Sequence, residues 1–96
     1  MSVKSSVNSD FNYPQFGRLH FDASFVSDQV PELLMMEIRQ KGKFVSSRTV
    51  AEIFKTTRIG FNSNALKNGL YEISFKHRTF GKLVEGPSFK VTIKND

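Results

Sequence analysis

His20 and Asp22 are the first residues of the chain whose types and spacing suit a chemical role. They lie in a stretch where polar and apolar residues alternate, and in a strand residues two apart point to the same face. An imidazole and a carboxylate on one face provide two ligands for a divalent metal. The sequence offers no obvious third ligand, and both types are common on solvated strand faces. It therefore predicts no metal site and no cofactor.

Signals of catalysis are missing from the sequence. The chain has no cysteine, which excludes disulfides, thiolate zinc sites and cysteine nucleophiles. Its serines do not occur in the Gly-x-Ser-x-Gly turn of α/β-hydrolases. Gly81 and Gly86 lack the spacing of a phosphate-binding or dinucleotide-binding loop. We therefore expect a protein that is not an enzyme.

A basic and aromatic segment near the C-terminus is the best candidate for a binding surface. Its candidate residues are Lys76, His77, Arg78, Phe80 and Lys82. Loops of a β-sandwich gather at its ends and present side chains to partners. An exposed Phe80 would add an aromatic anchor of the kind that interfaces favour. The competing interpretation is a solubilising hairpin with one buried phenylalanine.

The charge is distributed unevenly along the chain. The formal net charge is +5, but residues 1–38 carry two basic and five acidic side chains, against twelve basic and four acidic in 39–96. A basic half indicates a polyanion partner such as nucleic acid or an acidic glycan. A modest net charge is equally ordinary for a small soluble domain. In a DNA-binding protein, Arg48, Lys55 and Arg58 would contact phosphates.

Alternating segments predict several strands. Apolar and polar residues alternate from Arg18 to Val26, from Tyr71 to Lys76 and from Ser88 to Lys94, and Ile59 with Phe61 suggests a further short strand. The Asn68-Gly69 dipeptide is a turn signal. Short strands separated by turns are typical of an all-β sandwich or barrel.

Two segments are ambiguous. The segment from Val30 to Lys41 has caps and residue types that suit a helix and an alternation that suits a strand, with residues 40–43 as a hairpin turn. The segment from Ser47 to Phe54 fits the first helix of a helix-turn-helix, with the later strands as the wing of a winged helix. Its recognition helix would span Arg58–Lys67, which contains Gly60 and poor helix formers.

Three pieces of the sequence resemble bacterial immunoglobulin-like and fibronectin-III-like surface modules. They are Met36–Val45, Leu66–Phe75, and Gly81–Val84 followed by Ser88–Ile93. The resemblance covers about two thirds of the chain and implies binding, adhesion or spacer roles without catalysis. The chain departs from the pattern in its longer segment Arg48–Thr57 and in having no cysteine pair and no tryptophan.

The sequence as a whole predicts an all-β, immunoglobulin-like sandwich of about seven antiparallel strands. Residues 1–15 would be a polar extended lead-in and 16–96 one domain, with Arg48–Phe54 a short helix or a bulged connection. Tyr71, just after a turn, would bury its ring and bond a nearby backbone group. The expected function is a non-catalytic binding or adhesion module of an extracellular, cell-surface or virion assembly, which recognises protein or glycan, acidic or not, through loop residues. The alternatives are a winged-helix DNA-binding regulator and a structural spacer. The sequence predicts no signal peptide and no membrane insertion.

Overall fold

The protein folds as seven β-strands and one short 3₁₀ turn in a computed structural model that describes residues 1–5, 18–26 and 30–95. The elements in chain order are β1 (Ser2–Ser5), β2 (Arg18–Ser24), β3 (Leu33–Gln40), β4 (Lys43–Val50), β5 (Thr56–Asn62), η1 (Ser63–Ala65), β6 (Gly69–Thr79) and β7 (Lys82–Ile93). Met1 and the strand β1 lie within the expected lead-in, residues 1–15, and residues 6–15 fall outside the described part of the chain.

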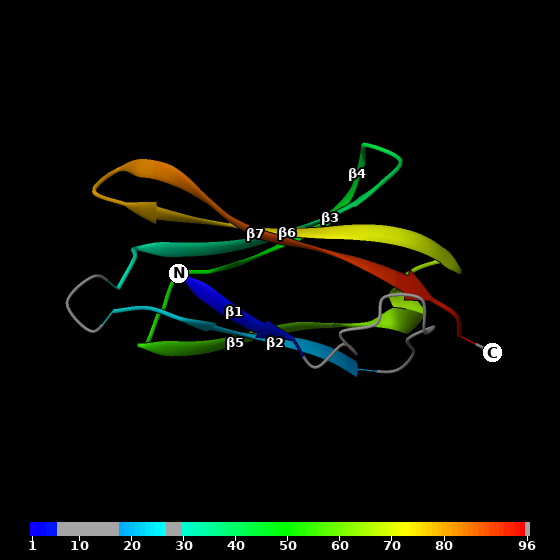
Figure 1. The fold of residues 1–96 in the computed structure, drawn as a ribbon, viewed down its shortest axis with the longest axis horizontal. Helices are drawn as coiled ribbons and strands as arrows, with labels where there is room; N and C mark the ends of the chain where they lie inside the picture. The colour runs from blue at the N-terminus through cyan, green and yellow to red at the C-terminus, as the bar shows by residue number, and fades with distance from the viewer. Residues whose placement is uncertain (6–17, 27–29, 96) are drawn as a thin grey trace.

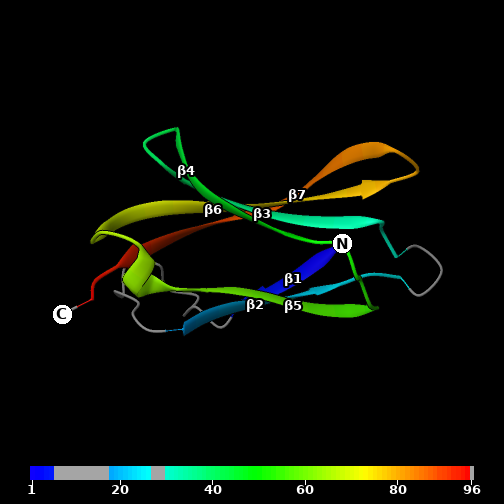
Figure 2. The same ribbon diagram turned by 180° about the vertical axis from the view of Figure 1, so that it is seen from behind.

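The strands form two stacked antiparallel sheets. One sheet has the order β1-β2-β5 and the other the order β4-β3-β6-β7, and Figure 1 shows the four-stranded sheet lying over the three-stranded one. The chain crosses between the layers from β2 to β3, from β4 to β5 and from β5 to β6. Seen from behind in Figure 2, the chain after β4 descends to the lower layer beside the N-terminus. Within the described ranges, no helix is long and apolar enough to cross a membrane.

The all-β prediction is confirmed, and the winged-helix alternative is wrong. The segment expected as its first helix is divided between β4, which pairs along its length with β3, and an irregular connection at 51–55. The segment expected as the recognition helix forms β5 and η1. The other ambiguous segment, Val30–Lys41, contains the strand β3. Its residues Leu34, Met36 and Ile38 are all buried in the core, which only the period of two of a strand allows. The short helix expected within Arg48–Phe54 is likewise absent there, since the one helical turn described is η1.

Two tight turns join the strands of the hairpins β3–β4 and β6–β7. Their central pairs are Lys41-Gly42 and Phe80-Gly81, and all four residues have positive φ, between 51° and 77°. Positive φ at both central positions is the mark of a type I′ turn, whose twist matches that of the strands. The segment from His77 to Gly86, whose two glycines indicate a loop or a broad hairpin, forms a hairpin with only two residues in its turn.

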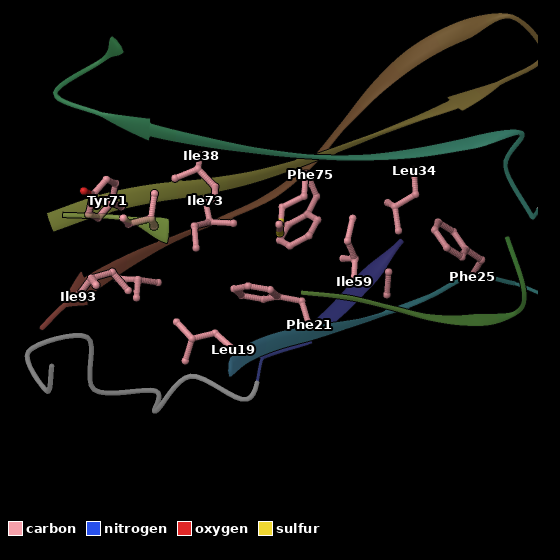
Figure 3. Packing of buried hydrophobic residues seen from close by; sticks show 14 residues of the cluster. Leu19, Phe21, Phe25, Leu34, Ile38, Ile59, Tyr71, Ile73, Phe75 and Ile93 are labelled. Atoms are coloured by element: carbon pink, nitrogen blue, oxygen red, sulfur yellow. The ribbon is translucent and has the colours of Figure 1, made fainter. Parts of the chain in front are cut away.

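The core lies between the two sheets and is rich in aromatic rings (Figure 3). Phe21 of the three-stranded sheet contacts Phe75 and Phe89 of the other, with ring centroids 5.1 and 5.5 Å apart. Such pairs add attraction beyond the area that they bury. This cluster holds the two layers face to face.

The end of the sandwich that contains η1 is closed by hydrogen bonds. The Tyr71 hydroxyl donates to the carbonyl oxygen of Lys67 at 2.6 Å, four residues upstream, as the sequence predicted. The Asn95 amide donates to the carbonyl oxygens of Ser63 and Leu66 at 3.0 and 2.9 Å. These bonds tie the chain after β7 to the turn before β6.

Candidate functional site

The opposite end of the sandwich gathers three connections between strands. We call it the loop end; its described residues are 25–26, 30–32, 51–55 and 80–81, together with the adjoining strand ends. Two backbone bonds hold it together: the N–H of Phe25 donates to the carbonyl of Lys55, and that of Glu32 to the carbonyl of Arg78, both at 2.8 Å. Figure 1 shows the β6–β7 hairpin and the N-terminus on this side.

Apolar side chains are exposed at the loop end. They come from every connection and from the start of β7: Val26, Val30, Phe54, Phe80, Leu83 and Val84. Val26, Phe80 and Val84 also line a hollow of about 330 Å³ whose floor includes Phe25. Clustered exposed apolar groups mark interaction surfaces in soluble proteins. The loop end is therefore the candidate for an interaction surface.

Phe80 is the most exposed large apolar residue in the described part of the chain. Its exposed fraction is 91%, at the tip of the β6–β7 hairpin, and its φ is +51°. A bulky side chain in the left-handed region is unfavourable by about 1–2 kcal/mol. The ring gains almost no burial there that would offset this. The structure thus presents an aromatic ring to solvent from a strained backbone.

The backbone of Phe54, a second exposed aromatic residue, is held by hydrogen bonds to Thr57. The hydroxyl of Thr57 accepts from the N–H of Phe54 at 2.8 Å and donates to its carbonyl oxygen at 3.0 Å. Thr57 itself is buried at the start of β5. Both polar groups of the Phe54 backbone are therefore fixed while its side chain stays 63% exposed.

His77 of β6 packs against a residue of the loop end from the side of the core. Its ring packs edge-on against Phe25 with centroids 5.9 Å apart, and its Nδ1 lies 2.9 Å from the Thr79 hydroxyl. Burial lowers the pKa of His77 below its ordinary value, and the positive amino group of Met1 lowers it further. The uncharged ring thus suits this apolar contact.

The structure separates the five residues of the predicted binding segment. Phe80 and Lys82 lie at the hairpin tip, and Arg78 is exposed just before it. Lys76 lies lower on the outer face of the four-stranded sheet, where its ammonium is 3.6 Å from Glu37. His77 points to the opposite face, against Phe25. Only the three residues nearest the turn are thus placed to meet a partner.

The three residues proposed for DNA do not form one surface. Arg48 and Arg58 line the same hollow on the edge of the sandwich, but Lys55 lies at the loop end. Of His20 and Asp22, the two residues considered as metal ligands, Asp22 is bonded to Arg58: its carboxylate accepts from Nε of Arg58 at 2.8 Å. That bond lowers the pKa of the Asp22 carboxyl. In the described ranges, His, Asp and Glu nowhere gather in groups of three or more.

Sequence reasoning missed most of the apolar surface at the loop end. Phe54 lies in the segment that fits a helix by sequence, and no local pattern indicates that Leu83 and Val84 are exposed. One signal was present, because Phe54 and Phe80 are large apolar residues outside the alternating runs. Neither models of known protein families nor curated proteins nor solved structures gave a significant match to the chain.

Proposed function

We propose that the protein is a non-catalytic binding module that recognises another protein through its loop end. The observation that carries this proposal is Phe80, an aromatic ring exposed on a strained turn. Anchors of protein interfaces are typically aromatic side chains that become buried in a pocket of the partner. Val84 lines the same hollow as Phe80, Phe54 is exposed at the same end, and Arg78 and Lys82 provide a basic rim.

The residue types in the β6–β7 turn support a role for Phe80 in binding a partner. A type I′ turn prefers Asn-Gly, Asp-Gly or Gly-Gly, because these pairs adopt positive φ at little cost. The sister turn of the β3–β4 hairpin has the flexible, polar Lys41 at the corresponding position. Folding alone gives no reason for phenylalanine at the β6–β7 tip. Burial of its ring in a partner would supply one.

We also propose that the sandwich has the immunoglobulin-like topology of fibronectin-III modules. In an immunoglobulin constant-type sandwich the fourth strand belongs to the sheet of the first, second and fifth strands. Here β4 instead pairs with β3, in the sheet of β6 and β7. The bond from Tyr71 at the start of β6 to Lys67 resembles the tyrosine corner of that class. Sandwiches of this kind present loops at one end as binding surfaces, which fits a surface or assembly protein.

Site-specific photo-crosslinking tests the proposed function. A benzoylphenylalanine would replace Phe80 or Phe54 in separate preparations, and Leu70 or Phe44 in controls. These control positions are similarly exposed, at 56% and 58%, near the opposite end. The preparations would be irradiated in an extract of the organism that makes the protein.

The proposal predicts one protein adduct that forms from positions 80 and 54 and not from 70 or 44. The same adducts from all four positions would contradict it, because the loop end would then have no preference. No adduct from any position would favour the structural spacer. An adduct made only of two copies of this chain would replace a foreign partner with self-association.

A further inference from the structure

A second hollow lies away from the loop end, along the exposed edge of β5. Its volume is about 400 Å³ and its lining is mostly polar. Three elements contribute to it, β2, β4 and β5, with the residues Arg18, His20, Arg48, Arg58, Gly60 and Asn62. Three arginines around one small hollow are a concentration of positive charge that neither the core nor the loop end explains.

Strand pairing places two of these arginines on one face. In the β2–β5 pair, Arg18 lies opposite Asn62 and Asp22 opposite Arg58. The intervening apolar residues of both strands point into the core, so the alternation directs Arg18 and Arg58 outward. Both guanidinium groups therefore flank the outer side of the hollow.

Arg48 reaches the hollow from the other sheet. It lies on β4 opposite Met36, and its guanidinium donates to the carbonyl oxygen of Gly60 at 2.6 Å. Gly60 is required here because a Cβ atom would lie 2.5 Å from the Leu19 carbonyl oxygen. The bond from Arg48 satisfies a backbone acceptor on the free edge of β5 and fixes the guanidinium across the gap between the sheets.

The positive charge in the hollow is only partly compensated. Asp22 binds Arg58 through two bonds, of 2.8 and 3.2 Å. Arg48 donates one N–H to the carbonyl oxygen of Gly60, and a guanidinium has five N–H donors. Within the described ranges, Arg18 forms no ion pair. Donors and net positive charge thus remain for a ligand oxyanion.

We propose that this hollow binds the acidic group of a sugar, a carboxylate or a sulfate, between Arg18 and Arg48. A hollow of this size suits a compact ligand, since small-molecule sites begin at roughly 300 Å³. An extended acidic peptide would need a free strand edge to pair with, and Arg48 occupies that edge at Gly60. A nucleic acid would need a track of phosphate contacts, and Lys55 lies at the other end of β5.

The test is an amide chemical-shift titration of the whole chain at low and physiological ionic strength. The probes are sodium sulfate, sodium glucuronate, a sulfated uronate disaccharide, a neutral disaccharide, polyglutamate and a thymidine oligonucleotide. The variant Arg18→Gln removes an exposed arginine, and Lys90→Gln is the matched control because Lys90 is exposed on the other sheet. Circular dichroism would confirm that both variants fold.

We expect the acidic disaccharide to shift amides of residues 18–20 and 58–62, and to bind about tenfold tighter than sulfate alone. Arg18→Gln should weaken this binding about tenfold, and Lys90→Gln should leave it unchanged. Sulfate binding as tightly as glucuronate and the disaccharide would reduce the site to one for free anions and overturn the sugar assignment. Tighter binding of polyglutamate or the oligonucleotide, shifts scattered over the surface, or no shift at all would overturn it as well.

Discussion

At the residue scale, the hydroxyl of Tyr71 is a single atom that fixes one end of the sandwich. It donates to the Lys67 carbonyl across the connection between β5 and β6, and its ring is buried. The substitution Tyr71→Phe keeps the ring and removes this bond. We expect the free energy of unfolding to fall by about 1–1.5 kcal/mol, measured by urea denaturation. An unchanged midpoint and slope would show that the bond contributes nothing.

His77 makes stability depend on pH. Its pKa is lowered in the folded state by burial and by the amino group of Met1, so the unfolded chain takes up a proton first as the pH falls. The free energy of unfolding should therefore be highest above the ordinary histidine pKa of about 6.5 and should decrease as the pH drops below it. The carboxyl of Asp22, whose pKa is also lowered, acts only at much more acidic pH, near and below its ordinary value.

Urea denaturation at about pH 7.5 and pH 5 checks this expectation across the histidine pKa. The variant His77→Phe keeps a ring against Phe25 but cannot take up a proton, so its loss of stability between the two pH values should be smaller. An equal loss in the variant and the original chain would assign the pH dependence to other groups.

At the element scale, the connection from β4 to β5 is held by Thr57. Its hydroxyl bonds both backbone groups of Phe54, so Thr57→Val should lower the free energy of unfolding by about 1–2 kcal/mol. The change should also reduce crosslinking from position 54, because that side chain would no longer be fixed. Thr56→Val is the control, since Thr56 is exposed. Equal effects of both substitutions would argue against the role of the Thr57 hydroxyl.

The elements differ in how far the sequence predicts them. Strands β2 and β6 bury every second residue along much of their length, and β7 does so near its end, so the period of two in the sequence reveals them. Strand β4 is exposed along nearly its whole length, so its sequence carries no such period, and a helix from Ser47 to Phe54 fitted the sequence as well. Pairing with β3 decides its conformation, and this is a tertiary contact that a local pattern cannot contain.

The candidate site was predictable only in part, for a related reason. Phe80 and Lys82 were found because a glycine marks the turn beside them. Phe54 comes from a distant part of the sequence and reaches the loop end because the chain changes sheets after β4. The same crossing brings Arg48 to Gly60. Contacts across the gap between two sheets depend on strand order, which spacing along the chain does not encode.

At the scale of the whole molecule, the two ends of the sandwich are held by different contacts. They are separated along the longest dimension of 42 Å. The end with η1 is closed by the bonds of Tyr71 and Asn95, whereas the loop end exposes Phe54 and Phe80. Phe44 and Leu70 are also exposed near the end with η1, so the proposed preference of a partner for the loop end rests on Phe80 and its turn.

The most direct test of the central claim compares the same substitution in the two type I′ turns. Asn-Gly is the preferred pair for such turns, so Phe80→Asn and Lys41→Asn should each raise the free energy of unfolding, by about 1 kcal/mol. The decisive measurement is the affinity of each variant for the protein that crosslinks to position 80. We predict that Lys41→Asn binds like the original chain and that Phe80→Asn loses at least about tenfold. Equal affinity of the two variants would contradict the account, because Phe80 would then be no anchor.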